Sequence, residues 1–336
     1  MKTRLLPICL VAALLFSMSS CFLFEKKNNN NTPTTINVYT LNGTTGFGMA
    51  KLMNDAKANK TTEKYNFSVQ TDASMVTSAL LNGSADIAAL PTNAAANIYN
   101  KSEGGVVVLA VNTLGCLYLL TNQNATVTSF EDLRGKTVYV PAQNPTFIFT
   151  YLCKQNGLEI GKDITIDSTT YAQPAALKDA VAAGVVDIAV LPEPMVTIAI
   201  NAAKSANNGT VITDAMDLTA AWNKVSPEGS LVQGCVVVRR AFLEQYPEAV
   251  ENFLKEYKAS IEYLSANIDS ASQMIVDNGI FTNAGVAKKA LPNCNVCFLD
   301  GAAMKSAMET YLGILNGIAP ASIGGKLPAD NFDYVK

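Results

Sequence analysis

The same short phrase occurs twice in this chain, and it constrains the possible fold more than any other feature. Residues 83–91 read GSADIAALP and residues 184–192 read GVVDIAVLP, so six of nine positions match at an offset of 101 residues. Each copy is an apolar stretch of strand length that stops at proline. Proline cannot donate a hydrogen bond within a sheet but is tolerated in the first turn of a helix. The repeat therefore predicts two strands, each followed directly by a helix.

The residues around both copies follow one common order. In each unit a β-rich stretch is followed by a polar corner, a helical pattern, a second strand, a second helix and then the repeated strand. Gly83 and Gly184 suit the ends of the second helices, because glycine adopts positive φ without strain. This alternation predicts an α/β fold with two mainly parallel sheets, each flanked by helices. The predicted strands are 36–40, 67–69 and 86–90 in one unit and 137–140, 164–166 and 187–191 in the other, with second helices at 73–81 and 174–183.

Four polar corners follow the predicted strands. In open α/β sheets, ligands bind beyond the carboxyl ends of the strands, where helix N-termini present free N–H groups. A single copy fits plain helix capping equally well, since Thr92 and Asn93 are typical capping residues. Two copies favour a cleft shared by two lobes. The corners are residues 43–46, 92–93, 143–146 and 193–194.

Two chain crossings are expected between the lobes, near residues 112–118 and 229–236. A double crossing acts as a hinge, and a hinge beside a cleft favours closure around a ligand. The helical pattern after the second crossing returns to the first lobe, which is therefore discontinuous. The predicted division is lobe 1 at 36–113 plus 232–336 and lobe 2 at 117–228.

The first residues have the pattern of an export signal. Lys2 and Arg4 precede an apolar run at 5–16, which is shorter than the roughly 20 residues of a membrane-spanning helix. The pattern predicts a signal peptide over 1–20. Cys21 follows a pair of serines, which resembles the bacterial lipoprotein signal in which this cysteine is lipidated on sulfur; ordinary cleavage beside a free Cys21 is the alternative. The polar, asparagine-rich stretch within 21–35 predicts a flexible tether.

Composition excludes several functions. The chain has no histidine, which rules out Ser-His-Asp and Cys-His catalysis and every His-ligated metal site. Charged residues make up only 16% and the net charge is −3, so no basic surface for nucleic acid is expected. Neither a cofactor nor a metal site is predicted. The lone C-x-x-C at Cys294 and Cys297 is interpreted as a thiol pair, with a disulfide or a metal site as alternatives.

Several phrases together resemble one known family, the solute-binding lipoproteins of bacterial ABC importers of the nitrate, sulfonate, taurine and thiamine-precursor kind. The resemblance spans residues 36–336 and implies a two-lobed periplasmic-binding-protein-like fold of type II. No single phrase is specific, but the combination in the second lobe is. The matching phrases are GTTGFGMAKLM at 43–53, DIAALP at 86–91, DLRGKTV at 132–138, VDIAVLPEP at 186–194, YPEAV at 246–250 with Phe253-Leu254, and GGKLP at 324–328.

The resemblance implies which residues bind the ligand. Flat heterocycles could stack on Phe47, Phe147 or Tyr118, although ordinary core packing is the alternative for each. The Gln143-Asn144-Pro145-Thr146 corner replaces the glycine-serine corner of many relatives, which argues against a bare inorganic anion such as nitrate. The implied ligand-binding residues are Thr44, Thr45, Gly46, Thr92, Asn93, Gln143, Asn144, Thr146 and Glu193.

Glu193 has two open interpretations. Facing the ligand, it would favour a cation or a hydrogen-bond donor such as an amine or aminopyrimidine. At the rim, it would contact the permease or cap a helix.

The predicted function is a non-catalytic receptor, tethered to the outer face of the cell membrane. It would lie on the periplasmic side where an outer membrane exists. As a monomer, it would close on a small sulfonate-like or heterocyclic solute and deliver it to the transmembrane subunits of an ABC permease, which is driven by a cytoplasmic ATPase. One alternative is an enzyme on the same fold, a lyase or synthase of menaquinone or pyrimidine type. Another is a sensory lipoprotein.

Overall fold

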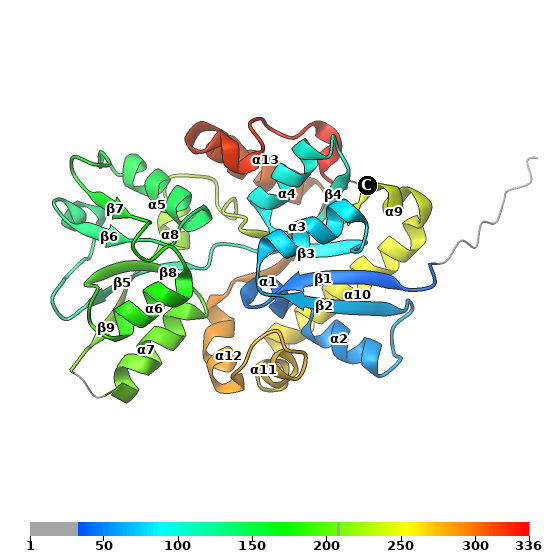
Figure 1. Cartoon of the computed structure of the whole chain (residues 1–336), viewed down its shortest axis with the longest axis horizontal. Helices are drawn as coiled ribbons and strands as arrows, with labels where there is room; N and C mark the ends of the chain where they lie inside the picture. The colour runs from blue at the N-terminus through cyan, green and yellow to red at the C-terminus, as the bar shows by residue number, and fades with distance from the viewer. Residues whose placement is uncertain (1–32, 207–208, 336) are drawn as a thin grey trace, which may run out of the picture. The chain divides into compact units, whose positions relative to one another are not determined.

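The computed structural model describes residues 33–206 and 209–335 and contains two β-sheets flanked by helices (Figure 1). The predicted signal peptide, Cys21 and nearly all of the predicted tether lie outside the described residues. Within the described part, no helix combines the length and apolar character needed to cross a bilayer. The first sheet has the order β11-β4-β10-β3-β1-β2, formed by Val296–Leu299, Val106–Thr113, Gly234–Arg239, Ile87–Pro91, Ile36–Leu41 and Tyr65–Gln70. The second has the order β7-β6-β8-β5-β9, formed by Thr165–Asp167, Thr137–Tyr139, Ile188–Pro192, Leu117–Asn122 and Ile212–Asp217.

The helices follow the strands in the predicted alternation. Residues 73–81 and 174–183 were predicted as helices, and the structure has α3 at Ala73–Asn82 and α6 at Pro174–Ala182. Gly83 ends α3 with a φ of 82°, as its position in the repeat predicts. The other helices are α1 Thr44–Phe47, α2 Ala50–Lys57, α4 Thr92–Lys101, α5 Asn144–Gln155, α7 Met195–Ala206, α8 Leu218–Trp222, α9 Arg240–Gln245, α10 Pro247–Ala266, α11 Ile268–Asp277, α12 Ala284–Ala290 and α13 Gly301–Ile318. Short 3-10 turns lie at Phe130–Leu133, Leu291–Asn293, Pro320–Ile323 and Asp330–Phe332.

Both sheets contain the predicted parallel strands, and antiparallel strands make each sheet mixed. In the first sheet β1 pairs in parallel with β2 and β3, but β10 lies between β3 and β4 and is antiparallel to both. In the second sheet β5 lies between β8 and β9 and is antiparallel to both. These two strands are antiparallel because of the chain path. Each follows a crossing from the other sheet and enters its own sheet at the carboxyl end of the neighbouring strand, so it runs in the opposite direction.

The pairing places the two crossings beside the repeated Leu-Pro ends. Gly234 at the start of β10 pairs with Pro91 on one side and Thr113 on the other. In the second sheet, Leu117 at the start of β5 pairs with Pro192. The carboxyl ends of β3 and β8 are therefore the edges at which the chain passes between the sheets, and this gives the repeated phrase its structural meaning.

The core is built on the crossing strands. Every residue of β4 and of β5 is buried, as expected for strands covered on both faces. The long helix α10 buries one stripe against the first sheet, with apolar residues three and four apart as the sequence predicts. Its largest buried side chains, Phe253 and Tyr257, are stacked with ring centroids 5.4 Å apart.

Candidate functional site

Thr44 joins the edge of the first sheet to the edge of the second. It is the first residue of α1, within the corner that follows β1, and it is buried. Its hydroxyl donates a hydrogen bond of 2.8 Å to the backbone carbonyl of Glu193, which follows β8. Two of the four predicted corners, 149 residues apart in the chain, therefore meet directly.

The corner after β3 lies at the N-terminus of α4. Thr92 is fully buried and Asn93 is 8% exposed, yet neither caps the helix, because the N-cap residue is Pro91 and no side chain caps α4. Asn93 Oδ1 has no hydrogen-bond partner among the described residues. The Thr92 hydroxyl forms no regular hydrogen bond there either, although it interacts with the thiol of Cys235. Buried polar atoms are normally paired, so an acceptor left open at a helix N-terminus is a feature expected of a ligand site.

The corner after β6 includes the first residues of α5 and carries three predicted site residues. Asn144 is half-buried, and its Oδ1 accepts a 2.6 Å hydrogen bond from the Tyr311 hydroxyl of α13. Gln143 is exposed. Thr146 donates its hydroxyl to the Pro141 carbonyl at 2.7 Å, so this group is used within its own corner. Asn144 thus connects this corner to α13 through a hydrogen bond.

Glu193 is 3% exposed and lies between the two sheets' edges. Its carboxylate accepts hydrogen bonds from the backbone N–H of Thr197 at 3.2 Å and from the Thr197 hydroxyl at 2.8 Å, which caps the start of α7. Burial raises the pKa of Glu193; hydrogen bonds from Thr197 and from the Asn293 side chain oppose that rise, and the charge of Asp214 adds to it. Within residues 33–206 and 209–335, Glu193 takes part in no ion pair.

Thr45 and Gly46, the other predicted residues of the first corner, both contribute through their backbone. Thr45 is half-buried, and its carbonyl accepts a 3.1 Å hydrogen bond from Asn112. Gly46 is held so tightly that a Cβ atom there would lie 2.1 Å from the Leu41 carbonyl oxygen. The close approach of the backbone requires glycine at this corner.

The three aromatic residues proposed for stacking are all at least partly buried. Phe47 is fully buried and packs edge-on against Phe281, with ring centroids 6.1 Å apart, so its ring belongs to the core in this structure. Tyr118 is buried, and its hydroxyl donates to the Asn293 carbonyl at 3.0 Å. Phe147 is partly buried against the core.

The sequence analysis did not identify several residues that contact the predicted site residues. Tyr311, Asn293 and Cys294 come from the C-terminal third of the chain, outside the repeated units. Cys294 Sγ lies 3.6 Å from the Thr44 hydroxyl. Cys294 and Cys297 are both free thiols, and burial raises the pKa of Cys297 to about 12. The C-x-x-C pattern at Cys294 and Cys297 was the only sequence signal for the segment that contains Asn293 and Cys294. Nothing in the repeat pointed to Tyr311.

A family model described as "ABC transporter, phosphonate, periplasmic substrate-binding protein" matches residues 50–279. That range includes the corners after β3, β6 and β8. No curated protein sequence matches the chain at a significant level.

Solved structures share the fold. A structure described as an ABC transporter from Parabacteroides distasonis has a TM-score of 0.74 and 23% identity, covering 90% of this chain and 100% of its own. The periplasmic aliphatic sulphonate binding protein SsuA from Escherichia coli has a TM-score of 0.68 and 14% identity, covering 90% and 99%. The periplasmic nitrate-binding protein NrtA from Synechocystis PCC 6803 has a TM-score of 0.60 and 16% identity, covering 86% and 83%. The two mixed sheets flanked by helices are those of type II periplasmic binding proteins.

Proposed function

Because the chain belongs to the family of phosphonate-type periplasmic substrate-binding proteins of ABC transporters, we propose that it closes two lobes around a small organic solute and delivers that solute to an ABC permease. The lobes are residues 36–113 plus 232–336 and residues 117–228. The observation that carries the proposal is the hydrogen bond between Thr44 and Glu193, since it joins the ligand-binding edge of one sheet to that of the other.

Closure by ligand binding is energetically feasible. Shifting a two-state equilibrium from 1:99 to 99:1 requires about 5.5 kcal/mol of differential affinity. Micromolar binding supplies about 8 kcal/mol in total. The solute can therefore drive closure with an ordinary affinity.

The charges at the site favour a solute that carries an amine. Glu193 is buried without an ion pair among the described residues, and Asn93 Oδ1 is an open acceptor. Burying an unpaired carboxylate is costly, and a cation or donor on the solute would offset that cost. The helices α4 and α5 both begin at this site without a side-chain cap, so their free N–H groups suit an anionic end, at about 0.3–1 kcal/mol for each helix. A taurine-like aminosulfonate satisfies both requirements, and an aminopyrimidine-type heterocycle satisfies the first.

Calorimetry of the purified protein tests this proposal with matched solutes. Taurine and ethanesulfonate share the sulfonate, and only taurine carries the amine. We expect taurine to bind at least tenfold more tightly than ethanesulfonate, and Glu193→Gln to remove most of that difference. An aminopyrimidine and methylphosphonate complete the panel. Binding of none of the four solutes would contradict the proposed solute class, and chemical conversion of any of them would contradict a receptor.

The proposal includes a lipid anchor at Cys21. The serine pair before Cys21 and the short apolar run support it, and both lie in the part of the sequence before residue 33. Anchoring would hold the binding protein at the outer face of the membrane, close to the permease.

A further inference from the structure

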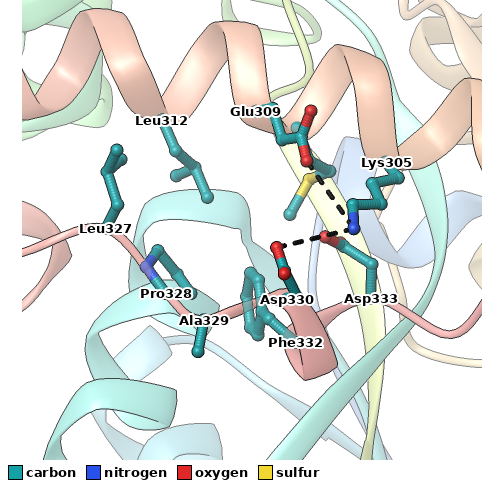
Figure 2. A pocket seen from close by; sticks show the side chains of 10 residues that line it. Lys305, Glu309, Leu312, Leu327, Pro328, Ala329, Asp330, Phe332 and Asp333 are labelled. Atoms are coloured by element: carbon teal, nitrogen blue, oxygen red, sulfur yellow. Dashed lines mark ion pairs between the residues drawn. The ribbon is translucent and has the colours of Figure 1, made fainter.

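A cavity of about 260 Å³ lies between α13 and the C-terminal segment 327–333 (Figure 2). Its apolar wall consists of Met308, Leu312, Leu327, Pro328, Ala329 and Phe332. None of the predicted ligand-binding residues lines it. Ligand pockets in proteins are mostly apolar with a few placed polar groups, and their volumes begin near about 300 Å³. This cavity therefore suits a small ligand with an apolar body.

The wall that carries residues 329–334 is fixed by the fold. Phe332 is buried and packs edge-on against Tyr99 of α4, with ring centroids 4.9 Å apart. Asp333 forms a β-bridge with Val108, and the next residue donates its N–H to the Val108 carbonyl at 2.9 Å. The segment therefore extends the edge of the first sheet, which gives the cavity a rigid wall.

Asp333 contributes a polar group without a partner. Its Oδ1 is buried and accepts no hydrogen bond from any described residue. Burial raises the pKa of the carboxyl to about 6; the charge of Lys305 opposes that rise and the charge of Glu309 adds to it. A buried unsatisfied acceptor costs about 1–3 kcal/mol, and more when it is charged, unless a donor is supplied.

The nearest cation does not supply that donor. Lys305 Nζ lies 3.8 Å from Glu309 and 3.7 Å from Asp330, and Figure 2 shows these two ion pairs. No ion pair to Asp333 occurs in the described part of the chain. Among the lining residues, three carboxylates face one ammonium, so the cavity has an excess of negative charge.

We propose that this cavity is a second binding site, separate from the cleft, for a small primary amine with an apolar body whose ammonium group pairs with Asp333. The apolar body would occupy the space between Leu312, Leu327 and Phe332. The ammonium would pair with the half-buried carboxylate of Asp333 and neutralise part of the negative charge of the cavity.

Calorimetry of the full chain at pH 8 tests the site with 2-phenylethylamine. Phenylacetate is the matched probe, because it keeps the aromatic body and carries the opposite charge. We expect the amine to bind at least tenfold more tightly than phenylacetate, and to weaken at pH 5 because Asp333 is then protonated. Asp333→Asn should weaken amine binding at least tenfold. Asp300→Asn is the control, since it removes an exposed carboxylate at the start of α13, the helix on the other side of the cavity, and should change the affinity less than twofold.

Two further variants make the result decisive. Leu327→Trp should fill the cavity and abolish binding of the amine without changing the charge. Glu193→Gln changes the cleft and should leave amine binding to this cavity unchanged. A failure of the second-site proposal is therefore distinguishable from a failure of the proposed function. Equal binding of amine and phenylacetate, equal effects of Asp333→Asn and Asp300→Asn, or loss of amine binding in Glu193→Gln would each overturn the proposal.

Discussion

Gln143 and Gly43 hold the same unusual backbone conformation at corresponding corners of the two repeated units. Gly43 has φ 79° and ψ −156°, and Gln143 has φ 68° and ψ −126°. Glycine adopts this region without strain, whereas a residue with a Cβ does so at a cost of about 1–3 kcal/mol. Such strain is concentrated at ligand-binding sites, and here it lies in a residue predicted to bind the solute.

Replacing Gln143 by glycine should stabilise the protein. We expect Gln143→Gly to raise the free energy of unfolding by about 1 kcal/mol, because relief of strain exceeds the added entropy of the unfolded chain. Gln173→Gly is the matched control: Gln173 is also an uncapped N-cap glutamine of a helix with proline in its first turn, but its φ is −98°. Denaturant unfolding of both variants measures the difference. Equal effects would show that Gln143 is not strained.

Asp333 gives the stability a defined pH dependence. Its folded-state pKa of about 6 lies above the ordinary 3.8, so the native state binds this proton more tightly than the unfolded state. The free energy of unfolding should therefore fall as pH rises from about 4 to about 6. Asp333→Asn should raise it above pH 6 by at most about 3 kcal/mol and have little effect below pH 4. Urea unfolding from pH 4 to 8 tests this, and a pH-independent difference would contradict it.

A hydrogen bond between α13 and α5 can be tested by a single substitution. The Tyr311 hydroxyl of α13 reaches Asn144 at the start of α5, so these two helices meet at the proposed site. Tyr311→Phe removes this hydrogen bond, worth about 1 kcal/mol, and we expect about fivefold weaker solute binding.

Tyr334→Phe is the control for that experiment. It also removes a tyrosine hydroxyl, which donates to Glu251 of α10 at 2.6 Å, away from the corners. The control should alter stability while leaving solute affinity within twofold. Equal losses of affinity in both variants would remove α13 from the site.

Local patterns predicted the elements well. The strand predicted at 86–90 is Ile87–Pro91, and the helix predicted at 73–81 is Ala73–Asn82, because short-range periodicity determines such elements. The order of strands was harder to predict. The insertion of β10 between β3 and β4 joins residues about 120 to 150 positions apart, and no local pattern carries that pairing.

The candidate site was predictable only where the repeat reached it. Thr44 and Glu193 lie at repeated strand ends, so the sequence pointed to both, and the structure brings them together. Tyr311 and Asn293 meet the same region from segments without a repeat. Their roles depend on tertiary packing, which sequence periodicity does not encode. The predicted ligand contacts of the individual residues stay predictions.

At the scale of the whole molecule, the proposed anchor determines where the protein acts. Cys21→Ala should prevent lipidation and move the protein from the membrane fraction to the soluble extracytoplasmic fraction. Solute affinity should not change, because the tether contributes no residue to the four corners. Fractionation followed by immunoblotting measures the shift, and membrane retention of the variant would contradict the anchor.

The two sheets meet at their edges through Thr44 and Glu193, and the proposed function places the solute between them. Hydrogen-exchange mass spectrometry, with and without saturating taurine, tests this most directly. We predict slower exchange at all four corners, residues 43–46, 92–93, 143–146 and 193–194. Protection confined to the corners of one sheet, or found only elsewhere in the chain while taurine binds, would contradict a shared cleft.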